Sequence, residues 1–138
     1  MPRREGFLRE EDLAAESFGL VISCSVFEHV RSREPLDEMV SLLGQNGVLG
    51  VHTVVCEQVP RDKDWFYYLP VHCAFFTNES MRRLCKQWGF RSSFYLLPAR
   101  LWFLCKQPLE QLPREVRQIL EGEDWSAKNG FMDFWRQD

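Results

Sequence analysis

The sequence predicts an α/β fold, a sheet with flanking helices in which the first two strands pair in parallel and the last two are antiparallel. Two short apolar runs, over residues 19–24 and 48–55, have the continuous or β-branched character of buried parallel strands. Between the two runs, apolar residues recur at the spacing of one helix face. A strand, a helix and a strand with short connections form a βαβ unit, in which the two strands pair in parallel.

The first strand changes character where it ends. In the stretch FGLVISCSVFEHV, residues 18–30, an apolar run gives way to Ser23, Cys24 and Ser25 and then to an acid beside a histidine. In open α/β sheets, ligands bind beyond the carboxyl ends of the strands, so this change favours a ligand site. The continuous apolar run also predicts that the strand is covered on both faces, with helices flanking it.

The next two elements are a helix of about ten residues and the second strand. Pro35 suits the first helical turn, and Gly44 stands where a left-handed cap ends a helix. Four apolar residues between them share one helix face: Leu36, Met39, Val40 and Leu43. The strand over 48–55 follows the short QNG connection.

The second half of the chain predicts a long loop, another helix and a hairpin. Residues 56–76 hold two prolines, a charge cluster and many aromatics without a period, which indicates an ordered loop over a site or core edge. Thr77 then caps a helix that Gly89 closes. Runs over 90–97 and 101–105 form an antiparallel hairpin, which ends the sheet.

The tail, residues 107–138, is predicted to be helical. A short apolar face follows Pro113, and the spacing of Phe131, Phe134 and Trp135 indicates a terminal helix packed on the body, with a partner-binding stripe as the alternative. The expected organisation is an amino-terminal segment over 1–17, an α/β core over 18–106 and this tail.

Composition limits the classes of function. Lysine and arginine number 17 against 20 acids, which argues against a nucleic-acid or anionic-membrane partner. Five cysteines without a CxxC pair indicate a reduced protein, and no signal peptide or membrane span is visible, so we expect a cytoplasmic location. Of the cysteines, Cys24 and Cys73 are expected to be buried packing residues.

Three blocks in this order resemble the class I S-adenosylmethionine-dependent methyltransferases. DLAAESFGLVISCSVFEHV is similar to the family's fourth strand, LDEMVSLLGQNGVLGVHTVV to its next helix and fifth strand, and HCAFFTNESMRRLCKQWGF to the element that follows in one branch. The resemblance covers about residues 10–106. It implies a partial Rossmann-like sheet with strands equivalent to the fourth to seventh, the last pair antiparallel, and methyl transfer to a small-molecule acceptor.

The resemblance also assigns site residues. S-adenosylmethionine would lie across the carboxyl ends of the strands, against the residues that follow the first strand: Ser23, Cys24, Ser25 and Phe27. The aromatic loop would cover the acceptor, with four residues as candidate contacts: Trp65, Tyr67, Tyr68 and Phe76. These rings could instead form the loop's own small core.

Candidate catalytic residues are His72, Glu28 and His29. His72 falls in the loop that the resemblance places over the acceptor, and Glu28 and His29 would be an acid-base pair. The structural alternatives are a histidine hydrogen-bonded within a packed loop and one that caps the following helix. We expect no metal site, because the four residues of suitable type have no compact ligand spacing: His52, Cys56, His72 and Cys73.

Part of the family's pocket has no counterpart in this sequence. Its glycine-rich turn and its ribose-binding acid belong upstream of the fourth strand, where only seventeen residues precede Phe18. The expectation is therefore a truncated methyltransferase-like domain, inactive alone, with a non-catalytic interaction or structural module as the alternative. The edge of strand 20–24 would then need a cover: a second copy, a partner chain or the tail.

Overall fold

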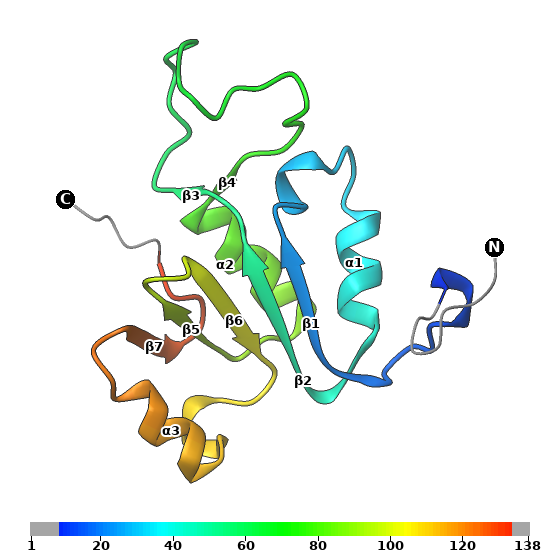
Figure 1. Cartoon of the computed structure of the whole chain (residues 1–138), viewed down its shortest axis with the longest axis vertical. Coiled ribbons are helices and arrows are strands. Elements are labelled where there is room, and N and C mark those ends of the chain that lie inside the picture. The colour runs from blue at the N-terminus through cyan, green and yellow to red at the C-terminus, as the bar shows by residue number, and fades with distance from the viewer. Residues whose placement is uncertain (1–8, 134–138) are drawn as a thin grey trace.

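The computed structural model describes residues 9–133, which form a mixed five-stranded sheet with helices packed against it (Figure 1). Strand β1 is parallel to β2, whereas β6 is antiparallel to both β2 and β5, and β7 is antiparallel to β5. The spatial order is β1-β2-β6-β5-β7, with these bounds in the same order: Phe18–Cys24, Leu43–His52, Leu101–Cys105, Ser92–Leu96 and Trp125–Asn129. The α/β class, the parallel first pair and the antiparallel hairpin are confirmed.

The helices begin close to their predicted signals. Their bounds are Glu34–Ser41 for α1, Asn78–Trp88 for α2 and Arg114–Leu120 for α3. Three short 3₁₀ turns complete the helical elements: η1 at Glu10–Asp12, η2 at Phe27–His29 and η3 at Leu109–Gln111. Within residues 9–133, no helix has the length and apolar character that crossing a membrane requires.

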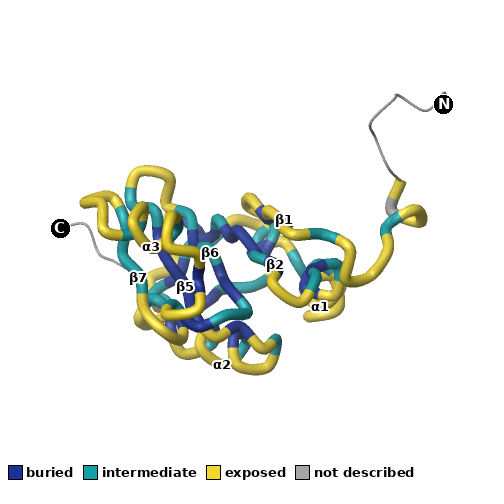
Figure 2. Tube along the Cα trace, turned by 90° about the horizontal axis from the view of Figure 1, so that it is seen from below, coloured by how far each residue is buried: buried dark blue, intermediate teal, exposed yellow. Residues whose placement is uncertain are grey.

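The main core lies between α1, α2 and one face of the sheet. Trp102 and Leu49 of the sheet pack in one cluster with Leu36 of α1 and Met81 of α2, and all four are almost fully buried. On the opposite face, a smaller cluster joins Phe94 to the segment around η3 and α3. The covered part of the sheet is therefore centred on β2, β6 and β5 (Figure 2).

Strand β1 corrects the prediction of cover on both faces. Within residues 9–133 it pairs only with β2, and its outward face leaves Leu20 and Ile22 50% and 54% exposed. Among residues 9–133, α1 and α2 cover one face of the sheet, and the η3–α3 segment packs around the strands at its far end. The apolar run alone therefore indicated strand character but not what would lie against it.

The end of α1 is also corrected. The helix stops at Ser41, its C-cap Leu42 keeps right-handed geometry, and Leu43 already pairs with Phe18 of β1. Gly44 is needed for space rather than for a left-handed cap, because a Cβ there would lie 3.3 Å from the carbonyl oxygen of Glu16.

The 107–138 tail contains a strand that was not predicted. Strand β7 extends the sheet beyond the hairpin, so the tail is not wholly helical. Gly130, with φ +82°, ends the strand, and Phe131 then stacks on Trp102 at 5.7 Å between ring centroids. Phe131 packs on the body as expected, but its backbone is irregular and not helical. The other two residues of the predicted terminal helix, Phe134 and Trp135, lie outside the described residues.

The long loop is closed at its base by a two-stranded parallel sheet, β3 at Val55–Cys56 and β4 at Phe76–Thr77. Thr77 then caps α2 in a reciprocal box: its Oγ1 accepts from the Ser80 amide at 3.1 Å, and its own amide donates to Ser80 Oγ at 2.8 Å. This cap fixes where the loop ends and the helix begins.

We expect Thr77→Ala to lower the free energy of unfolding by about 1 kcal/mol, because it removes the cap of α2. Chemical denaturation monitored by circular dichroism measures this value. The matched control is Thr77→Ser, which keeps the hydroxyl and should retain most of the stability. Equal losses in both variants would show that the hydroxyl does not cap the helix.

Candidate functional site

The candidate site lies where β1 and β2 end side by side. Cys24 is the register partner of His52, and the Ser25 amide continues the ladder by donating to the His52 carbonyl at 2.9 Å. The Ser25 hydroxyl lies 3.4 Å from Nδ1 of the same histidine. The small residues predicted at the strand end therefore meet polar groups of the neighbouring strand.

Two of these small residues have unusual local states. The Ser23 side chain is 2% exposed, and its hydroxyl has no hydrogen-bond partner among the described residues. Ser25 has φ +54°, a left-handed conformation that non-glycine residues seldom adopt. An unpaired buried hydroxyl and a strained backbone both cost stability, and both concentrate at functional sites.

The other two predicted residues of this segment point to different surroundings. Cys24 is exposed, and so is Cys73 of the loop, which corrects the expectation that both are buried packing residues. Phe27 is almost fully buried in the main core, with its ring 5.4 Å from that of Phe76. The structure therefore leaves the strand end, rather than Phe27, accessible to a ligand.

Glu28 of η2 is held inside this region. Its side chain is 4% exposed and accepts a hydrogen bond from the Thr53 hydroxyl at 3.0 Å. The same hydroxyl lies 3.5 Å from that of Tyr67. Burial raises the pKa of Tyr67, the Thr53 hydrogen bond opposes that rise, and the negative charge of Glu28 adds to it.

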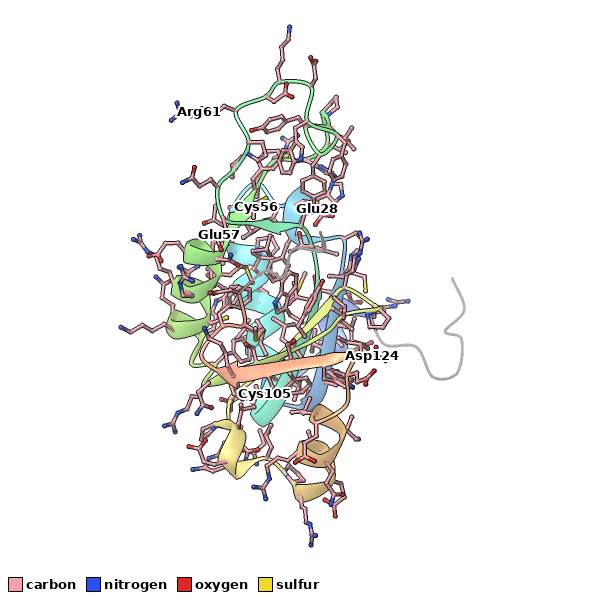
Figure 3. All side chains as sticks on the ribbon, turned by 90° about the vertical axis from the view of Figure 1, so that its left-hand side faces the viewer. Glu28, Cys56, Glu57, Arg61, Cys105 and Asp124 are labelled. Carbon is pink, nitrogen blue, oxygen red and sulfur yellow. The ribbon has the colours of Figure 1, made fainter. Side chains whose placement is uncertain are left out.

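The loop is tied to η2 through Glu28 and the two histidines. The Glu28 carbonyl accepts from the amides of Cys73 and Ala74, at 2.7 and 3.1 Å. These bonds bring the His72 ring to 5.0 Å from the His29 ring. The structure thus unites the three predicted catalytic residues at the base of the loop, where Figure 3 shows Glu28.

The loop's aromatic residues pack on one another. The Trp65 ring lies 5.5 Å from Tyr67 and 5.1 Å from Tyr68, and Phe75 joins the group at 5.0 Å from Tyr68. Phe76, the fourth predicted acceptor contact, instead packs in the main core. The loop therefore has the small core of its own that was the structural alternative.

Beside this cluster, a cavity of about 330 Å³ opens between the end of β2, the loop and the β5–β6 hairpin. Trp65, Tyr95 and Trp102 supply apolar walls, and Thr53 and Arg100 supply polar groups. Burial raises the pKa of Tyr95, and the Arg100 charge partly offsets that rise. A flat apolar molecule with an anionic group matches this lining.

Several of these residues were not predicted as site residues. Thr53 directly follows the second strand, at a position like that of the small residues at the end of the first strand. This position at a strand end could have identified Thr53 as a site residue from the sequence. Arg100, with φ +50°, closes the hairpin turn, and only the folded hairpin brings it to the cavity. Phe75 replaces its neighbour Phe76 in the loop because strand β4 begins at Phe76 and turns it inward.

The four residues considered as zinc ligands do not form one group within residues 9–133. His72 instead forms a group with Glu28 and His29, which includes neither His52 nor a cysteine. Buried cysteines offer little nucleophilic chemistry, because burial raises the pKa of Cys85 to about 12 and that of Cys105 to about 11.

Comparison with models of known protein families finds no match, and a search of curated proteins also finds none. The function therefore has to be inferred from the residues and their geometry.

We expect Ser23→Ala to raise the free energy of unfolding by about 1 kcal/mol, because it removes a buried hydroxyl without a partner. The matched control is Ser92→Ala in β5, where the hydroxyl is equally buried but donates to the Gln107 carbonyl at 2.5 Å. That variant should lose about 1 kcal/mol. Urea denaturation of both variants measures the difference, and a loss at Ser23 as large as that at Ser92 would contradict this reading of the site.

Proposed function

We propose that this chain supplies the cofactor-facing strand end and the acceptor side of a class I S-adenosylmethionine-dependent methyltransferase. The observation that carries the proposal is the end of β1, with the unpaired hydroxyl of Ser23 and the strained backbone of Ser25. This is where the resemblance places the methionine portion of the cofactor. A ligand here would contact the exposed Cys24 and Ser25, and it would accept the Ser23 hydrogen bond only if the strand end moved to uncover that buried hydroxyl.

The sheet supports the same proposal. Strands β1, β2, β5 and β6 follow the chain order of the expected fourth to seventh strands, with the last pair antiparallel. The open edge and outward face of β1 are where further strands and helices of a complete cofactor site would pack. Their cover would come from another polypeptide segment or a partner chain.

The cavity supports a small-molecule acceptor. Trp65 offers a flat surface. Arg100 forms no ion pair with an acid among the described residues, so it is available to an anionic group. In such a reaction, positioning of acceptor and sulfonium carries most of the rate, because the methyl group is already activated. His72, the predicted proton acceptor, lies with Glu28 and His29 and is not part of this lining, so this candidate role would require the acceptor to reach beyond the cavity.

Binding of S-adenosylhomocysteine to the ¹⁵N-labelled chain tests the cofactor site. Because one wall of the pocket is present, we expect affinity in the millimolar range, about −4 kcal/mol. Amide shifts should concentrate at Ser23, Cys24 and Ser25 and leave α3 unchanged. Cys24→Phe should abolish them by crowding the strand end, whereas Cys73→Phe, at an equally exposed cysteine, should not. Shifts spread over the surface, or none, would contradict the proposal.

A second candidate is a non-catalytic interaction module, and the apolar edge of β1 favours it. Leu20 and Ile22 project from a strand whose outer backbone groups pair with no strand in residues 9–133. Such an edge is a template for pairing with another chain, and a second copy can pair with it about a twofold axis.

For this candidate, we expect the purified chain to elute as a dimer or larger species at micromolar concentration. Ile22→Lys should shift it to the monomer, because a charged side chain at the edge opposes pairing. Ile119→Lys on α3 is the matched control: Ile119 is 58% exposed, against 54% for Ile22, and lies away from the edge. Size-exclusion chromatography with light scattering measures the mass, and a monomeric wild-type chain would contradict self-pairing.

A further inference from the structure

The most specific arrangement of side chains outside the cavity is the group formed by Glu28, His29 and His72. A carboxylate oxygen of Glu28 and one ring nitrogen of each histidine all lie within 4.8 Å of one another. We propose that this group binds a divalent first-row transition ion of the Zn²⁺ type. The proposal rests on these three residues and their partners, and it does not depend on methyl transfer.

The donor set determines the class of ion. Imidazole nitrogen suits Zn²⁺, Fe²⁺, Ni²⁺ and Cu²⁺, whereas Mg²⁺ and Ca²⁺ prefer sites made of oxygen. Two histidines and one carboxylate are the protein ligands of catalytic zinc sites and of non-haem iron sites, which keep open positions. Two ligand atoms that each lie about 2.1 Å from a tetrahedral ion are about 3.4 Å apart. The ligand atoms here lie within 4.8 Å of one another, so binding an ion would shorten each distance between them by at most about 1.4 Å.

The hydrogen bonds of both histidines prepare them as ligands. Nδ1 of His29 lies 3.0 Å from the Val71 carbonyl, and Nδ1 of His72 lies 2.7 Å from the Tyr67 carbonyl. A carbonyl oxygen only accepts, so each Nδ1 carries a proton, and Nε2 is the nitrogen through which either ring would bind an ion. Metal-binding histidines ordinarily have such a partner, which fixes the tautomer and the ring orientation.

The carboxylate of Glu28 would attract a cation to this group. Its carboxylate is almost fully buried, and among residues 9–133 no lysine or arginine forms an ion pair with it. Its described side-chain hydrogen bonds join it to two hydroxyl side chains, those of Thr53 and Tyr67. Buried carboxylates are ordinarily paired with a cation or coordinate a metal, and here an ion between the two histidines would supply the missing positive charge.

The surroundings leave room for an exogenous ligand. His29 is exposed and His72 is half-buried, so solvent reaches the group through its histidines. Three protein ligands fill three positions, and a remaining position can take water or an oxygen ligand. The two backbone bonds between Glu28 and the loop hold the donors from both segments together before an ion binds.

The test uses the full chain, freed of metal with a chelator and titrated with Co²⁺ as a spectroscopic probe and with Zn²⁺ in calorimetry. We expect visible d–d absorption with Co²⁺ at one equivalent, and Zn²⁺ binding that persists in a large excess of Mg²⁺. His29→Gln and His72→Gln should each weaken binding at least about tenfold. Two controls should leave it unchanged: His52→Gln, a histidine outside the group, and Cys73→Ser, which removes a nearby thiol.

A second readout follows the three histidine rings directly, because the chain contains only three. In long-range ¹H–¹⁵N spectra, Zn²⁺ should shift the ring nitrogens of His29 and His72 and leave those of His52 in place. Thermal unfolding with and without Zn²⁺ is expected to show that the variant His29→Gln, at an exposed residue, is folded but is no longer stabilised by the ion. Absence of Co²⁺ bands, a Zn²⁺ site lost equally in the His52 variant, or a preference for Mg²⁺ would overturn the proposal.

Discussion

The parallel pairing of β1 with β2 is the constraint on which the rest of the structure depends. It brings two strand ends together that are separated in sequence by a helix, so that Cys24 and His52 become register partners. Because both strands end at the same edge, η2 after β1 and Thr53 after β2 are neighbours. The hydrogen bond from Thr53 to Glu28 is a direct consequence of that register.

The 57–75 loop depends on the same strand ends in turn. Backbone amides of Cys73 and Ala74 donate to the Glu28 carbonyl, while the aromatic rings of the loop pack on one another. The loop is therefore ordered from both ends, by the β3–β4 ladder at its base and by η2 at its side. This order gives His72 a fixed position beside His29, and it gives the cavity next to Trp65 a defined wall.

In contrast to the ordered loop, the outward face of β1 is left largely uncovered. On the face of β1 turned toward the main core, Ser23 is buried and Val21 is partly buried. On the other face, Leu20 and Ile22 are half exposed. The unpaired Ser23 hydroxyl and the strained Ser25 lie on the same strand and just past its end. Both features cost stability in the region where the proposed cofactor and the proposed partner would contribute contacts.

Local signals in the sequence determined most elements, because caps, periods and β-branched runs act over a few residues: Thr77 began α2, and the runs around Pro98 formed the hairpin. The sequence also singled out Glu28, His29 and His72. Only the tertiary structure decided that the three lie together, that Arg100 reaches the cavity and that β7 joins the sheet, since these depend on long-range pairing. Dependence on long-range contacts also explains the uncovered face of β1. An apolar run shows that a strand has side chains suited to burial, but these side chains are buried only where another element packs against them.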